Sequence, residues 1–161
     1  MNYAHYCDVA ELLDFPGPEF ATRGRALLGF LRDNYPDAAA EAALFLDAIP
    51  QRTLDLQELH TRTFDVQAVT TLGTGYVLFG DDYKRGALLS NLNREHNDAE
   101  NDCRGELADH LPNVLRLIPK LKDQNLLEEL VEQILVPALM LMIREFDPER
   151  IEKKNANYRK H

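Results

Sequence analysis

Residues 106–142 read ELADHLPNVLRLIPKLKDQNLLEELVEQILVPALMLM, and this stretch decides the fold class. Its apolar residues recur at three- and four-residue steps, which is the spacing of one face of an α-helix. A helix is predicted over residues 106–121, with Pro112 near its start, where a missing N–H is tolerated. A second helix is predicted from about Asp123, and Pro137 inside it is expected to kink it. The predicted buried face of the first helix consists of Leu107, Leu111, Leu115 and Ile118.

The remaining sequence has the same helical spacing almost throughout. Further helices are predicted near residues 6–13, 20–35, 39–49, 56–64 and 82–97. Residues 65–71 are less regular, and no other segment alternates in the way that a partner strand would. We therefore expect Thr70 or Thr71 to cap a short helix that ends at Gly80.

The predicted fold is all-α, a single-domain bundle of about six to eight helices over residues 1–161. This length suits one domain with one core of its own. Residues 148–161 are polar and basic, so they are predicted to form a frayed tail or a short surface helix.

The charge of the chain argues against a nucleic acid as its main partner. There are 18 Lys and Arg residues against 27 Asp and Glu residues, which gives a formal net charge of -9. A protein that neutralises phosphates needs a cationic face, and the sequence offers only a short basic tail. An acidic surface favours cationic partners, although acidic residues also serve solubility alone.

Cysteine usage and hydropathy indicate where the chain is expected to reside. Cys7 and Cys103 are far apart and form no C-x-x-C pair, which argues against a disulfide framework or a zinc site. No apolar run approaches the roughly 20 residues needed to span a bilayer, and the N-terminus lacks the pattern of a secretory signal. A soluble, cytoplasmic protein without stable membrane insertion is predicted.

The sequence contains no convincing catalytic or cofactor motif. GTGYVLFG, residues 73–80, lacks the G-K-[ST] ending of a phosphate-binding loop. The five histidines form neither H-E-x-x-H nor E-x-x-H, and Glu106 with His110 would by themselves make a poor metal site. We therefore predict a binding protein rather than an enzyme, with no metal and no cofactor of its own.

Three blocks of sequence resemble a known family. They are TFD (63–65) followed by TTL (70–72), GDDYKRG (80–86) and ELADHLP (106–112). Their order and spacing resemble those of the nitrate reductase delta-subunit chaperones, the NarJ branch of the NarJ/TorD family. The third block resembles the family's E-x-x-D-[HY]-[LI]-P signature, and residues 137–139 resemble its later proline-alanine-leucine step.

The chain also departs from that pattern. Thr71 stands where the family usually has serine, Gly73 and Gly75 stand where longer side chains are common, and residues 83–85 contain fewer arginines. The tract YVLFGDDYKRG, residues 76–86, is closer to chaperones of related molybdoenzymes. Those enzymes process selenate, chlorate, dimethyl sulfide or hydrocarbons rather than nitrate.

The resemblance implies an assembly chaperone for a molybdenum oxidoreductase. Such a protein binds the immature catalytic subunit at its N-terminal segment, which often carries a twin-arginine motif. It holds that subunit during molybdopterin insertion and before export or membrane docking. A monomer, or a weak or domain-swapped dimer, is expected. The alternatives are a permanent helical adaptor or regulatory subunit of a respiratory complex and, third, a small metal-dependent hydrolase.

The expected client site is an apolar groove with carboxylates at its edge, which would bind arginines by bidentate hydrogen bonds. Glu106, Asp109 and His110 are predicted to lie at the edge of the groove, and the other residues of the set given below are predicted to line its apolar part. The acids could instead cap helices, the histidine could bond a carbonyl in the core, and the aromatics could be ordinary core residues. The predicted set is Glu106, Asp109, His110, Leu111, Pro112, Tyr76 and Phe79.

Overall fold

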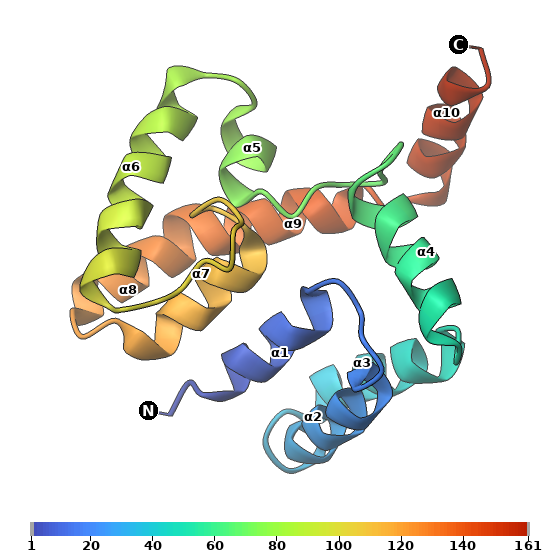
Figure 1. The fold of residues 1–161 in the computed structure, drawn as a ribbon, viewed down its shortest axis with the longest axis horizontal. Coiled ribbons are helices and arrows are strands. Elements are labelled where there is room, and N and C mark those ends of the chain that lie inside the picture. The colour runs from blue at the N-terminus through green and yellow to red at the C-terminus, as the bar shows by residue number, and fades with distance from the viewer. Residues whose placement is uncertain (1, 161) are drawn as a thin grey trace.

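The computed structural model describes residues 2–160, and these residues form helices joined by turns and loops, with no β-strand (Figure 1). The all-α prediction is confirmed. The elements are α1 (His5–Leu13), α2 (Phe20–Asn34), α3 (Pro36–Ala48), α4 (Thr53–Phe64), α5 (Thr74–Phe79), α6 (Tyr83–Asp98), α7 (Leu111–Leu117), the 3₁₀-helix η1 (Ile118–Lys120), α8 (Gln124–Glu129), the π-helix η2 (Leu130–Leu135), α9 (Val136–Arg144) and α10 (Pro148–Tyr158).

The described residues form nine helices when η1 is counted with α7, which it continues, and the unbroken run from α8 through η2 to α9 is counted as one. This is slightly more than the predicted six to eight, because residues 148–158 form a surface helix of their own. Lys154 anchors that helix by donating to the Val69 carbonyl and by pairing with Glu145 at 2.9 Å. No helix among residues 2–160 combines the length and the apolarity that crossing a membrane requires.

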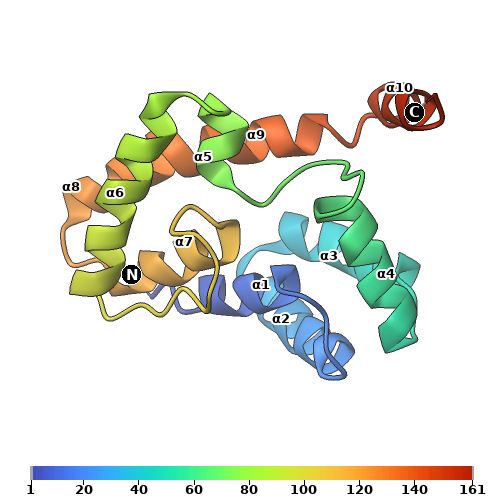
Figure 2. The ribbon, with the colours of Figure 1, turned by 45° about the horizontal axis from the view of Figure 1, so that its top comes forward.

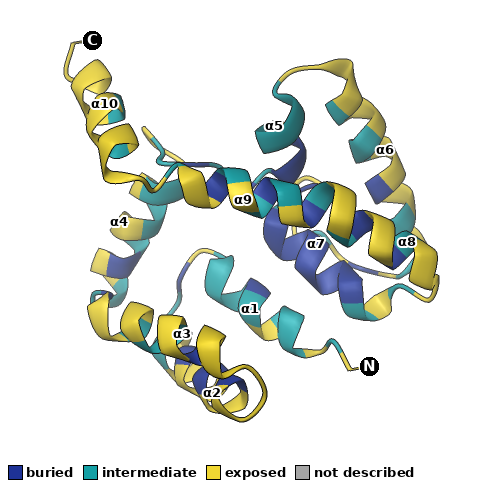
Figure 3. Ribbon diagram, turned by 180° about the vertical axis from the view of Figure 1, so that it is seen from behind, coloured by how far each residue is buried: buried dark blue, intermediate teal, exposed yellow. Residues whose placement is uncertain are grey.

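Helix α7 forms the centre of the main core. Every residue from Leu111 to Ile118 is buried, and α1 packs along α7 (Figures 1 and 3). Helix α6 and the long helix α8–η2–α9 enclose the other sides of the core. Burying such a short helix on all sides requires it to be apolar all round, and the sequence LPNVLRLI meets that requirement except at Asn113 and Arg116.

A smaller group of helices, α2 to α4, lies on the other side of α1 (Figure 2). Small residues, Gly24 of α2 and the alanines of α3, allow these two helices to approach closely. A Cβ atom on Gly24 of α2 would lie 2.5 Å from Cδ2 of Leu46 of α3. Helix α1 therefore has one core on each of its two sides, and the two groups of helices meet around it.

Pro137 does not end the long helix. The π-helix η2 lies directly before α9, in which Pro137 is the second residue. A proline has no N–H to donate and its ring crowds the carbonyl four residues earlier, so a local π turn relieves the conflict.

Two predicted helix starts are wrong, and both errors lie in the same part of the structure. Helix α7 begins at Leu111 rather than Glu106, since His110 has an extended conformation, with ψ 126°. As a consequence, Leu107 is 55% exposed instead of buried. The N-cap residue of α5 is Gly73 rather than Thr70 or Thr71, and the helix begins at Thr74.

Three buried polar side chains hold the connection between α6 and α7. Nε2 of His96 bonds the Ala108 carbonyl at 2.9 Å, and Asn101 donates to Nδ1 of His96 at 3.0 Å. Asn113 donates to the carbonyls of Cys103 and Leu107 at 3.0 and 3.1 Å. Because Nδ1 must accept the bond from Asn101, His96 is neutral and carries its proton on Nε2.

Unfolding at mildly acid pH tests this assignment. Burial lowers the pKa of His96 below its ordinary value, although the bond to Ala108 opposes the shift. The unfolded chain then binds the proton at about pH 6.5 while the folded chain does not, so stability is complete above that pH and falls below it. The loss is expected to reach at most about 1.4 kcal/mol per pH unit for this group.

Urea unfolding of the wild type and of His96→Gln at pH 7.5, 6.5 and 5.5 measures the effect. His96→Gln is expected to be less stable at pH 7.5 but to lose stability more slowly on acidification. Equal slopes in the two proteins would contradict the assignment.

Candidate functional site

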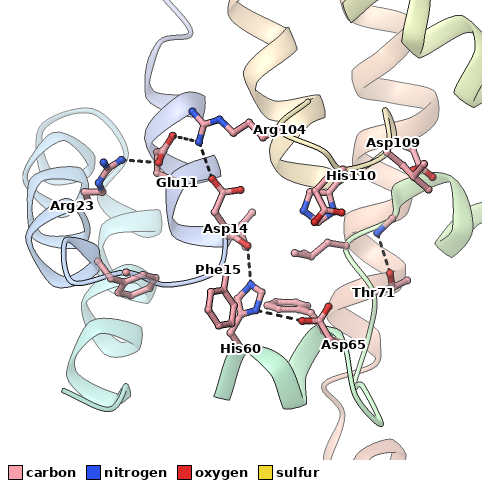
Figure 4. Close-up of a pocket in the computed structure, with 18 of the residues that line it drawn as sticks. Glu11, Asp14, Phe15, Arg23, His60, Asp65, Thr71, Arg104, Asp109 and His110 are labelled. Carbon is pink, nitrogen blue, oxygen red and sulfur yellow. Dashed lines mark hydrogen bonds and ion pairs between the residues drawn. The ribbon is translucent and has the colours of Figure 1, made fainter. Parts of the chain in front are cut away.

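A cavity of about 810 Å³ lies where the two groups of helices meet (Figure 4). Its walls are the end of α1, the α1–α2 connection, the end of α4 and the segments 71–73 and 104–110. We call it the acidic cleft. Its carboxylates are Glu11, Asp14, Glu19, Asp65, Glu106 and Asp109. Its arginines are Arg23, Arg85 and Arg104.

Charge and apolar surface occur together in the acidic cleft. Six carboxylates face three guanidinium groups, so the lining carries a net three negative charges when its two histidines are neutral. Phe15, Phe20 and Phe64 supply aromatic surface, and Phe15 is 59% exposed. The cleft therefore combines features that suit a ligand with both cationic and apolar groups.

Asp109 is buried and bonded to its own chain. Its carboxylate, with the residue 1% exposed, accepts bonds from Nε of Arg85 at 3.0 Å and from the backbone N–H of Gly75 at 3.1 Å. Its backbone carbonyl accepts from both the N–H and the hydroxyl of Thr74, at 2.9 and 2.8 Å. Asp109 thus satisfies the free N–H groups at the start of α5 from a distant part of the chain.

This geometry corrects the role predicted for Asp109. A carboxylate that already binds Arg85 and is shielded from solvent is not free to bind the arginine of a partner. The capping alternative is the correct one, although the capped helix is α5 and not α7, which Asp109 precedes. Gly75 is required by the same contact, since a Cβ atom there would lie 2.7 Å from Oδ2 of Asp109.

Of the predicted set, Glu106 and His110 line the acidic cleft. Glu106 is exposed at the rim, whereas His110 is half-buried. Burial lowers the pKa of His110, and the nearby Arg116 adds to this, while Glu106, Asp14 and Asp109 oppose it. His110 is therefore neutral at pH 7, and the buried histidine that bonds a carbonyl is His96 instead.

The four apolar members of the predicted set do not line the acidic cleft. Leu111 and Pro112 are buried in the core, and Leu111 lines a separate, apolar groove of about 440 Å³ between α1, α7 and the long helix α8–η2–α9. Tyr76 is 44% exposed, and its ring lies 5.3 Å from the guanidinium carbon of Arg85. Phe79 is half-buried on α5. The predicted set thus divides among three places.

Glu11 and Asp14 are cleft residues that the sequence analysis missed. Arg116 of α7 donates to Glu11 at 3.0 Å and also bonds Asp14. Arg23 and Arg104 reach Glu11 from the other sides, at 2.7 and 3.1 Å. Burial alone would raise the pKa of Glu11, but the bond from Arg116 and the neighbouring arginine charges lower it below its ordinary value.

One sequence signal could have found this cluster. Arg116 is the only charged residue in the apolar run 111–118, and a buried arginine requires carboxylate partners. Glu11 and Asp14 are three apart on α1, a spacing that puts both on one face of a helix.

His60 joins α4 to the end of α1 at the edge of the acidic cleft. Its Nε2 lies 3.1 Å from the Leu13 carbonyl, and its ring makes edge contacts with Phe15 and Phe64. Asp65 lies 4.0 Å from its Nδ1. Across residues 2–160, no three His, Cys, Asp or Glu side chains are placed to hold a metal ion together.

Comparison of the chain with protein-family models and with curated proteins gave no match. The inference of function therefore depends on the residues and geometry of the acidic cleft, together with the three sequence blocks.

Asp109→Asn should destabilise the fold. The substitution leaves the partly buried guanidinium group of Arg85 facing a neutral amide instead of a carboxylate. We expect a loss of about 2–4 kcal/mol in the free energy of unfolding, measured in urea. Asp81→Asn is the matched control, since Asp81 is exposed in the same GDD sequence and should change stability by no more than about 0.5 kcal/mol. Equal, small effects of the two substitutions would contradict the structural role of Asp109.

Proposed function

We propose that this protein is an assembly chaperone that captures an arginine-bearing segment of an immature molybdenum oxidoreductase subunit in the acidic cleft. The observation that carries the proposal is the presence of exposed carboxylates without arginine partners beside an exposed phenylalanine. Capture by this cleft would hold the subunit during molybdopterin insertion and before export or docking. A cytoplasmic location is part of the proposal.

Three exposed carboxylates are available to a ligand. Glu19, Asp65 and Glu106 lie on separate segments around the acidic cleft. Among residues 2–160, Glu19 and Glu106 make no ion pair, and Asp65 has only the 4.0 Å approach to His60. A guanidinium group binds a carboxylate through two parallel N–H bonds, so arginine is the cation that these groups suit best.

Phe15 supports the choice of a peptide ligand. Its ring is 59% exposed within the lining of the acidic cleft. An exposed ring of this kind can pack on an apolar side chain or on the face of a guanidinium group. An amphipathic segment with arginines at one side of an apolar stretch would use both kinds of contact.

The arrangement of the three sequence blocks also supports the proposal. The Leu72 carbonyl of the first block accepts the Leu111 N–H of the third at 2.7 Å. Arg85 of the second block binds Asp109 of the third. Residues that carry the family resemblance thus meet at one wall of the acidic cleft, where Asp109 is a positioning residue and Glu106 a contact residue.

A permanent adaptor is the second candidate, and one surface favours it. Helix α9 and the turn after it expose the apolar side chains of Val136, Met140, Ile143 and Phe146. A lasting protein partner would cover such a stripe. Purification of the mature enzyme from cells separates the two candidates, because a chaperone is absent from it and an adaptor is present.

Removing one free carboxylate should weaken capture of an arginine peptide. Calorimetry is done with a synthetic amphipathic peptide that carries two adjacent arginines. Glu106→Gln is expected to reduce its affinity by about two- to fivefold and to flatten its salt dependence, since an exposed ion pair contributes up to about 1 kcal/mol and is screened by salt. Glu41→Gln, which removes an exposed charge on α3 away from the acidic cleft, should leave the affinity unchanged. Equal affinities for all three proteins would exclude Glu106 from the site.

Capture should also weaken at acid pH through His110. The lowered pKa of His110 puts the appearance of its positive charge below about pH 6.5, so affinity for the same peptide should hold from pH 7.5 to 6.5 and fall towards pH 5. In His110→Gln, which cannot be protonated, the fall should be smaller. A wild type and a His110→Gln variant with identical pH profiles would show that His110 takes no part.

A further inference from the structure

Arg104 already places a guanidinium group against two carboxylates of the acidic cleft. Its Nη1 lies 3.1 Å from Oε1 of Glu11 and 3.3 Å from Oδ2 of Asp14 (Figure 4). Its side chain is 52% exposed, so these contacts are made at the open surface of the cleft. This is the kind of contact that an arginine of a bound peptide would make.

Three arginines form ion pairs with Glu11 or Asp14, and they differ in how firmly the fold holds them. Arg116 is 7% exposed and bonds both carboxylates from within the core, so it is a fixed part of the fold. Arg23 is 51% exposed and pairs with Glu11 alone. Arg104 is the exposed arginine that spans both carboxylates. Exposed ion pairs contribute little to stability, so its contact can be exchanged at low cost.

The backbone around Arg104 is held independently of its side chain. Asn113 donates to the carbonyls of Cys103 and Leu107, on the two sides of Arg104. The N–H of Arg104 donates to Asp102 at 2.8 Å, and both Arg104 and Gly105 have positive φ angles, 54° and 81°. Release of the guanidinium group therefore needs a change of side-chain rotamer and no rearrangement of the loop.

We propose that Arg104 is an internal competitor for the guanidinium site formed by Glu11 and Asp14. A client arginine takes this site by displacing the Arg104 side chain. The inference rests on the proposed function, because it concerns how peptide binding in the same cleft is regulated. One guanidinium group replaces another, so the exchange itself contributes little affinity. The competition keeps binding reversible, as release of a mature client requires.

Calorimetry with two peptides tests the competition. The probes are the synthetic amphipathic peptide with two adjacent arginines and the same peptide with neutral citrulline at both positions. Arg104→Gln is expected to bind the arginine peptide about two- to fivefold more tightly than the wild type, the range that corresponds to loss of an exposed ion pair. Arg62→Gln is the matched control. It removes the same charge from α4, where Arg62 pairs with Glu58 at 2.6 Å outside the cleft lining, and should change the affinity less than twofold.

The ¹⁵Nε signal of Arg104 in the wild-type protein gives a second readout, and it should shift when the arginine peptide saturates the site. Equal or weaker binding by Arg104→Gln, or an unmoved signal on saturation, would overturn the competition while leaving peptide capture in place. Equal affinity of the wild type for the arginine and citrulline peptides would instead contradict the proposed function, and the competition with it.

Discussion

The ion pair between Arg85 and Asp109 is the interaction on which the shape of the acidic cleft depends. A carboxylate removed from water is costly unless its oxygens are bonded, and Asp109 receives bonds from Arg85 and from the N–H of Gly75. The backbone of Asp109 is fixed at the same time by Thr74. These bonds join the start of α5 to the start of α7, and so determine where Glu106 and His110 lie.

Helix α1 is the second constraint, because it contacts both α7 and α2. Its apolar face packs on α7, while Glu11 and Asp14 bind the buried Arg116. Removing either partner would leave a charge without compensation in a poorly solvated place, so this contact fixes the position of α1 closely. Because α1 also contacts α2, the same contact fixes the distance between the two groups of helices, and with it the width of the cleft.

The sequence predicted the helices well wherever local spacing alone determines them. Helix α6 was expected over residues 82–97 and is found at 83–98, with Asp82 capping its first turn. The starts of α5 and α7 were predicted wrongly because they are set by bonds between Asp109 and Thr74, 35 residues apart, which no local pattern contains.

The candidate site could be predicted only in part, for a related physical reason. Glu106 and His110 were found from the family resemblance and do line the acidic cleft. Asp109 was predicted to bind an arginine of a client protein, because sequence spacing does not show that Arg85 of the same chain binds it. Glu11 and Asp14 were missed because acids on an amphipathic helix are usually solvated, and only the burial of Arg116 distinguishes them. Tyr76 and Phe79 have the spacing of an apolar face, which does not say what that face contacts.

The composition of the acidic cleft favours a transient complex over a permanent one. Any attraction for a cationic segment would come from exposed carboxylates, and exposed charges are screened by salt within about 8 Å at physiological ionic strength. Such attraction speeds encounter more than it slows release. A permanent partner would instead need a large apolar contact, and the exposed apolar side chains of α9 lie outside the cleft. A client held in the acidic cleft would therefore leave when its arginines find a better site or become buried in its own fold, which is the behaviour that an assembly chaperone requires.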